Sequence, residues 1–145
     1  QLSHRNVVRL EARPSSPDGN LEISTKTLVR TALRLRPDRL IIGEVRGAET
    51  LDMLSAMNTG HDGSMSTIHA NSARDALRRV ESLVLQHAAN WSREIVQDHV
   101  ASSINAIVHV ARNIDGSRFV KEVLLVSREG LNEVVLDGRV LREVW

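Results

Sequence analysis

Cysteine is absent from the 145 residues, and aromatic side chains make up only 2% of them. Without cysteine the chain has neither disulfide bonds nor thiolate metal sites, which fits a reducing compartment. With so few aromatic rings it lacks the stacking platforms on which single-stranded nucleic acids bind. Its longest apolar runs, such as residues 40–42 and 123–126, are far shorter than the roughly 20 residues of a membrane-spanning helix. The sequence therefore predicts no direct membrane insertion and gives no support to nucleic-acid binding.

A strong charge of either sign is also missing. Charged residues make up 26% of the chain, but the formal net charge is only +1, so the overall field attracts no polyanion. Lysine occurs only at Lys26 and Lys121, and the other basic residues are arginine, which binds phosphates and carboxylates through a planar, two-pronged group. A chain of this length with 41% hydrophobic content can form one compact domain. It begins at Gln1 without a signal-peptide pattern, which predicts a piece excised from a longer protein.

The apolar periodicity predicts that strands and helices alternate. Ser24 or Thr25 can cap a helix that Pro37 ends, and Asn71 or Ser72 can cap a later one. The continuous apolar run at residues 40–42 is typical of a strand buried on both faces of a parallel sheet. We expect strands at residues 7–10, 39–45 and 64–69, helices at residues 25–35, 48–58, 72–87 and 92–104, and a loop at residues 14–20.

After Asn105 the pattern becomes that of antiparallel strands. Strand-like runs at residues 106–111, 119–126 and 133–136 are divided by the turn pairs Asp115-Gly116, Glu129-Gly130 and Asp137-Gly138. Each pair is a hairpin signal. The predicted fold class is therefore α/β, with a parallel sheet core, flanking helices and a C-terminal antiparallel β meander.

The first segment that can carry chemistry is residues 36–46, an apolar strand that delivers Glu44 at its carboxyl end. Ligands of open α/β sheets bind just beyond these strand ends. Gly43 lets the backbone approach a ligand closely, and a carboxylate at position 44 can orient and deprotonate a water molecule. The alternative is a surface glutamate that ends a core strand.

The second segment is residues 58–69, in which two histidines and several hydroxyls surround two glycines. If its strand neighbours the first one, His69 lies beside Glu44, where it can hydrogen-bond a terminal phosphate. A metal site formed by His61, Asp62 and His69 is the alternative, but it lacks the spacing of a zinc helix and the oxygen density of a calcium loop. In the plainest interpretation, His61 is an exposed turn residue and His69 a half-buried one.

Together the two segments resemble the motor ATPases of type II and type IV secretion and of pilus assembly, most closely the tight-adherence pilus branch. Residues 35–46 resemble the Walker B region of that family, and residues 59–69 resemble its His box. The resemblance implies a RecA-like P-loop NTPase fold, with Glu44 as the catalytic carboxylate and His69 as the contact to the γ-phosphate. The further nucleotide-binding residues that it implies are Gly43, Arg46, Gly60, His61 and Thr67.

The N-terminal segment, residues 7–14, is similar to the part of the family in which arginines reach the nucleotide, often across a subunit boundary. Arg9 and Arg13 are the candidates for this role. An arginine aimed at the γ-phosphate neutralises charge that develops during phosphoryl transfer. The alternative for each is a surface arginine on an edge strand.

The departure from the family is the missing phosphate-binding loop. No Gly-x-x-x-x-Gly-Lys-Ser/Thr pattern occurs, so the backbone cradle and lysine that hold the β- and γ-phosphates are absent. We therefore expect residues 1–145 to be the C-terminal portion of a motor domain, truncated downstream of that loop and inactive alone.

For the intact protein, the resemblance implies a cytoplasmic hexameric ring that binds ATP with Mg²⁺ and contacts an inner-membrane platform protein. The alternatives are a non-enzymatic oligomerisation or interaction module and, with less support, a RecA-like nucleic-acid motor.

Overall fold

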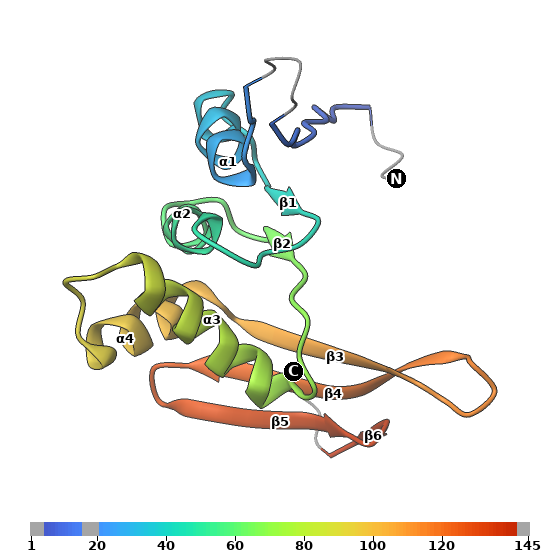
Figure 1. Ribbon diagram of the computed structural model, residues 1–145. Coiled ribbons are helices and arrows are strands. Elements are labelled where there is room, and N and C mark those ends of the chain that lie inside the picture. Colours follow the sequence, from blue (N-terminus) through green and yellow to red (C-terminus); the bar gives the residue numbers. More distant parts are fainter. Residues whose placement is uncertain (1–4, 16–20, 142–145) are drawn as a thin grey trace.

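The computed structural model describes residues 5–15 and 21–141. It is a mixed α/β structure with a small parallel sheet followed by a larger antiparallel one (Figure 1). Its elements are α1 (Thr25–Arg34), β1 (Ile41–Ile42), α2 (Glu49–Met57), β2 (Met65–Ser66), α3 (Ala73–His87), α4 (Arg93–Ser103), β3 (Ala106–Arg112), β4 (Arg118–Ser127), β5 (Gly130–Leu136) and β6 (Arg139–Val140).

Three of the four helices in the described residues begin at a serine cap. The hydroxyl of Ser24 accepts a hydrogen bond from the backbone of α1, and Ser72 and Ser92 do the same for α3 and α4. Such caps satisfy backbone N–H groups that have no partner inside the helix. The predicted helices are therefore confirmed, and the structure selects Ser24 and Ser72 from the alternative caps.

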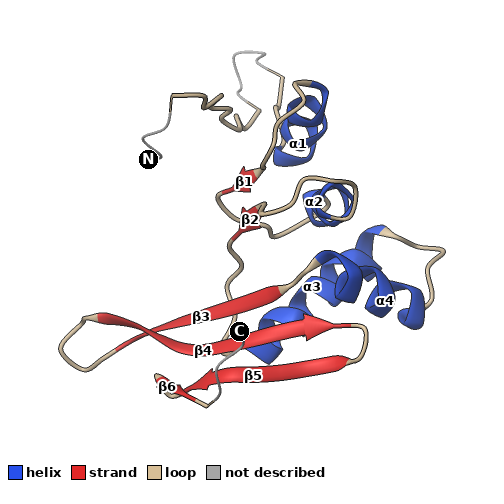
Figure 2. Ribbon diagram, turned by 180° about the vertical axis from the view of Figure 1, so that it is seen from behind, coloured by secondary structure: helices blue, strands red, loops and turns tan. Residues whose placement is uncertain are grey.

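Strands β1 and β2 form the parallel pair, with Ile41 opposite Met65 and Ile42 opposite Ser66. Both are much shorter than predicted. The prediction that the run at residues 40–42 is buried on both faces is also wrong, because Leu40 and Ile42 are buried but Ile41 is 47% exposed. Within the described residues, β1 pairs with β2 alone, and Figures 1 and 2 show α1 and α2 on the same side of this pair, so one side of Ile41 stays open.

The second sheet has the strand order β3-β4-β5-β6, with every pair antiparallel. Its turns fall at the three predicted hairpin signals, and Figure 2 shows α3 and α4 lying along one face. Along β3, alternate residues are half-buried and exposed, as expected of a sheet with one covered face. The predicted C-terminal antiparallel meander is confirmed.

One core joins the two sheets. Leu54 of α2, Val84 of α3, and Val96 and Val100 of α4 are at most 1% exposed and pack in one cluster with Ile42 of β1. Because α2, α3 and α4 also contact one another, burying these side chains holds the parallel pair at a defined position beside the larger sheet.

The predicted strand at residues 7–10 does not form. This segment has no regular structure, and Val8 and Leu10 are exposed by 70% and 42%. Neither sheet of the described residues includes this segment, and the bridge that follows it joins Arg13 to Ile23. Of the predicted loop at residues 14–20, positions 16–20 lie outside the described residues.

His99 of α4 contacts the edge of Trp91, with ring centroids 5.2 Å apart, and burial lowers its pKa. Folding therefore disfavours the protonated ring, so the stability that the neutral ring contributes is complete above the unfolded pKa of about 6.5 and is lost as the pH falls below it. Urea unfolding should show the free energy of unfolding decreasing from about pH 6.5 to 5 less steeply in His99→Gln than in wild type. Equal slopes in the two proteins would contradict this assignment.

Candidate functional site

Glu44 follows β1 and lies at the carboxyl end of the parallel pair. The buried residues on either side of it, Ile42 and Val45, are 8% and 2% exposed and hold the backbone against the core. The Glu44 side chain is 36% exposed. The Glu44 carboxylate therefore lies at the surface, while the buried Ile42 and Val45 hold the backbone beside it.

His69 follows β2 and meets Glu44 at the same edge of the sheet. Its Nε2 atom is 3.5 Å from Oε1 of Glu44, and its side chain is 84% exposed. The two groups form an ion pair when the imidazole is protonated. The structure therefore brings together the two predicted central residues, and His69 is exposed rather than half-buried.

Hydrogen bonds tie the segment after β2 to the segment after β1. The Thr67 hydroxyl donates to the Gly43 carbonyl, and the Val45 N–H donates to the Thr67 carbonyl at 3.0 Å. A Cβ atom added to Gly43 would meet nothing within 4 Å, so the space beside this backbone is open. These bonds place Thr67 and Gly43 beside the segments that carry Glu44 and His69.

The loop that leads into β2 is held by side-chain contacts to α2 and β1. Nδ1 of His61 lies 3.1 Å from the carbonyl of Ala56, and a carbonyl can only accept, so this nitrogen carries the proton. The Ser64 hydroxyl donates to the His61 carbonyl at 2.7 Å and accepts from the Leu40 N–H at 2.9 Å. Gly60, with φ of 90°, makes the turn after α2 in a conformation that side chains disfavour.

The arginine candidates are placed differently. Arg46 is exposed on the same loop as Glu44. Arg13 is engaged locally, with its guanidinium donating to the Leu21 carbonyl at 3.3 Å, and no hydrogen bond or ion pair joins it to Glu44 or His69. Arg9 is exposed on the irregular N-terminal segment. Of these three, only Arg46 shares a loop with a member of the central pair.

The metal alternative finds no support in the described ranges, 5–15 and 21–141. No three histidine, cysteine, aspartate or glutamate side chains gather there in a way that could hold a metal ion. Over the same ranges, no helix combines the length and hydrophobicity needed to cross a membrane.

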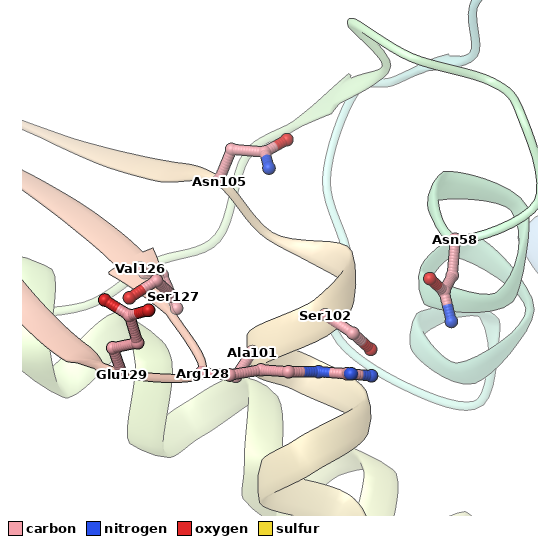
Figure 3. A pocket seen from close by; sticks show the side chains of 8 residues that line it. All are labelled: Asn58, Ala101, Ser102, Asn105, Val126, Ser127, Arg128 and Glu129. Carbon is pink, nitrogen blue, oxygen red and sulfur yellow. The ribbon is translucent and has the colours of Figure 1, made fainter.

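A separate hollow of about 590 Å³ lies away from Glu44 and His69. Figure 3 shows that its lining comes from three places: Asn58 after α2, Ala101, Ser102 and Asn105 at the end of α4, and residues 126–129 at the turn from β4 to β5. The lining includes none of the predicted site residues.

Sequence reasoning missed Glu49, the first residue of α2. Glu49 is 7% exposed, and its carboxylate accepts hydrogen bonds from the backbone N–H groups of Arg46 and Gly47 at 2.7 and 3.0 Å. The available signal was an acidic residue in the first turn of a predicted helix, close after Glu44. Ser64 was missed as well, since a serine inside a strand pattern shows nothing of the two partners it links.

Comparison with known proteins identifies the family of this chain. The family model described as "Type II/IV secretion system protein" matches residues 1–134. The conjugal transfer protein TrbB of Rhizobium radiobacter is 43% identical over 100 residues, which cover 69% of this chain and 29% of that protein. The type IV secretion system protein VirB11 of Brucella abortus is 32% identical over 125 residues, covering 83% and 34%. The chain spans about a third of the length of these curated relatives.

Solved structures agree in fold. The crystal structure of the VirB11 ATPase of Brucella suis in complex with sulphate superposes with a TM-score of 0.66 at 31% identity, over 71% of this chain and 32% of that one. The Legionella pneumophila ATPase DotB superposes with a TM-score of 0.56 at 24% identity, over 72% and 28%, which shows a shared fold. The family match over residues 1–134, the relatives and the shared fold show that the chain belongs to the type II/IV secretion system protein family.

Proposed function

We propose that this chain is the C-terminal part of the nucleotide-hydrolysing motor of a secretion ATPase. In the full-length gene product, ATP hydrolysis would power type II or type IV secretion or pilus assembly. The observation that carries the proposal is the 3.5 Å approach of His69 Nε2 to Glu44 Oε1 at the carboxyl ends of adjacent parallel strands. This is the edge at which ligands of α/β sheets bind.

In this proposal Glu44 is the general base for the attacking water. Its side chain is partly exposed, so water reaches the carboxylate, while the buried Val45 holds the backbone next to it. A carboxylate that accepts a proton from water as the water attacks the phosphorus raises the nucleophilicity of the oxygen. His69, beside it and more exposed, is positioned to donate a hydrogen bond to a terminal phosphate oxygen.

The remaining site residues have supporting roles. The open space beside Gly43 lets the backbone approach a nucleotide, while Gly60, His61 and Thr67 shape the loop and strand that present His69. The exposed guanidinium of Arg46 adds positive charge near the phosphates. In our proposal Arg9 and Arg13 act on the nucleotide of a neighbouring subunit, which accords with the absence of any bond from Arg13 to the central pair.

The residues present fit ATP with Mg²⁺ only in part. A phosphate-bound Mg²⁺ needs just one or two protein carboxylates, so a site with Glu44 and no larger acidic cluster among the described residues is compatible with it. When bound, Mg²⁺ neutralises phosphate charge. The backbone cradle for the phosphates would come from a part of the full-length protein outside these 145 residues.

The assembly follows from the same proposal. We propose a homo-hexameric ring at the cytoplasmic face of the inner membrane, docked on a platform protein of the secretion or pilus machine. Named relatives are a type IV secretion system protein and a conjugal transfer protein, which supports a role in such a machine. Nucleic acid is not among the proposed partners, because the net charge is only +1.

The test compares phosphate release by the full-length gene product and by residues 1–145 under identical conditions with ATP and Mg²⁺. We expect turnover from the full-length protein and none above the buffer blank from the 145-residue chain, because positioning and charge stabilisation of the phosphates supply most of phosphoryl-transfer catalysis. Comparable turnover by the 145-residue chain would refute the proposal that hydrolysis needs a phosphate-binding part outside these residues.

Two other outcomes favour the alternatives. A full-length protein that neither binds nor hydrolyses ATP would indicate a non-enzymatic interaction module. Hydrolysis that depends on single-stranded DNA, with salt-sensitive binding at physiological ionic strength, would indicate a nucleic-acid motor.

A further inference from the structure

Glu49 is a buried carboxylate without a cation. It is 7% exposed, and it forms no ion pair with any described residue. An ionised group in such a place is costly unless hydrogen bonds replace its water. In Glu49 these hydrogen bonds come from the N–H groups of Arg46 and Gly47, which donate to Oε1 at 2.7 and 3.0 Å. The positive end of the α2 dipole stabilises the carboxylate further.

These bonds fix the loop that carries Glu44. Going along the chain from Glu44, Val45 donates its N–H to Thr67 at 3.0 Å, and then Arg46 and Gly47 donate theirs to Glu49. Three consecutive N–H groups after Glu44 are therefore bound. An unbound loop at the surface would leave the Glu44 carboxylate free to sample several positions relative to His69.

The opposite end of α2 holds the other half of the site. The carbonyl of Ala56 in its last turn accepts the Nδ1–H of His61, in the loop that leads to β2 and His69. Leu54, between the two ends, is 0% exposed and anchors the helix in the core. One rigid helix thus contacts the loops that deliver both members of the central pair.

We propose that Glu49 is a positioning residue of the reaction, acting through Glu44. The inference rests on the proposed function, since it concerns how the water-activating carboxylate is held. A residue that only capped α2 would affect stability and leave the kinetics of the folded protein unchanged. A positioning residue would lower kcat while the KM for ATP stays the same, because the phosphates are bound by other groups.

The experiment uses the full-length gene product with Glu49→Ala, Glu49→Gln and, as a matched cap control, Ser92→Ala. Ser92 caps α4, away from Glu44, through its bond to the Ile95 N–H. We expect Glu49→Ala to lower kcat by about 10- to 100-fold at unchanged KM, as for a displacement of a catalytic group by about 1 Å. Glu49→Gln keeps one acceptor oxygen and should restore most of the rate, and Ser92→Ala should leave kcat unchanged.

Hydrogen exchange in the same proteins gives a readout independent of activity. The amides of Arg46 and Gly47 should exchange much faster in Glu49→Ala than in wild type, and at the wild-type rate in Ser92→Ala. Should Glu49→Ala fail to fold, Gly47→Ala serves as a second variant, because its Cβ atom would lie 3.3 Å from Oε2 of Glu49 and shift the carboxylate by a few tenths of an ångström. It should lower kcat below the wild-type value while the KM for ATP stays the same.

The outcomes separate this inference from the proposed function. Faster exchange at Arg46 and Gly47 with wild-type kcat would show that Glu49 is only a structural cap and would overturn the inference. Loss of kcat with a matching rise in KM would also overturn it. Full activity in Glu44→Gln would instead remove Glu44 from the mechanism, and the positioning role of Glu49 would fall with it. Absence of ATP turnover in the full-length wild-type protein would refute the proposed function.

Discussion

Replacing Glu44 by glutamine in the full-length gene product should lower kcat for ATP hydrolysis by about 10²- to 10⁴-fold, the contribution of a general base. Glutamine keeps the size and hydrogen-bonding capacity of the side chain but cannot accept the proton of the attacking water. Because the phosphates are bound by other groups, ATP binding should persist. Steady-state phosphate release gives kcat, and equilibrium binding of a labelled nucleotide gives the affinity.

Glu129→Gln is the matched control for this substitution. Glu129 is an exposed glutamate at the turn from β4 to β5, away from the Glu44–His69 pair. The same chemical change there should leave both kcat and nucleotide affinity at wild-type values. Retention of full turnover by Glu44→Gln would remove Glu44 from the mechanism, and loss of nucleotide binding would assign it to substrate binding instead.

Truncating Leu54 to alanine should lower the free energy of unfolding by about 2–5 kcal/mol, the range for a leucine removed from a packed core. Leu54 is 0% exposed and belongs to the cluster that joins α2 to α3, α4 and β1. Its loss leaves a cavity that the surrounding structure closes only in part. Domains are stable by only about 5–15 kcal/mol, so the effect is a large part of the total. Urea unfolding measures it.

Leu85→Ala on α3 makes the same chemical change at the surface. Leu85 is 37% exposed and lies outside the core cluster, so its truncation should lower the free energy of unfolding by about 1 kcal/mol or less. Equal losses for the two variants would show that the cluster around Leu54 is not the main source of stability. A change in m, the slope of the free energy of unfolding against urea concentration, would indicate an altered unfolded state.

The local rules that succeeded are those whose physics is contained in a few neighbouring residues. Ser24 and Ser72 cap helices, as predicted, because a serine oxygen can reach the N–H groups of the first turn. Asp137-Gly138 marks a hairpin because both residues adopt positive φ, 48° and 75°. Such features need no information from distant parts of the chain.

The predictions that failed depended on what lies beside a segment. Residues 7–10 have the composition of a strand, but a strand forms only when another strand pairs with it, and no strand in the described part of the chain pairs with this segment. Ile41 has the hydrophobicity of a buried residue, but its exposure depends on how many faces of the sheet are covered. Neither condition is expressed in the residues themselves.

For the site, the sequence alone determined the candidates: Glu44 after one apolar strand, His69 after the next, and the family that these segments resemble. It could not determine that the two side chains approach to 3.5 Å, because their separation depends on the register of Ile41 with Met65 and of Ile42 with Ser66. Nor could it show that Glu49 binds the backbone of the Glu44 loop. Only the tertiary structure decided these points, because packing around α2 sets the distance between groups that are far apart in sequence.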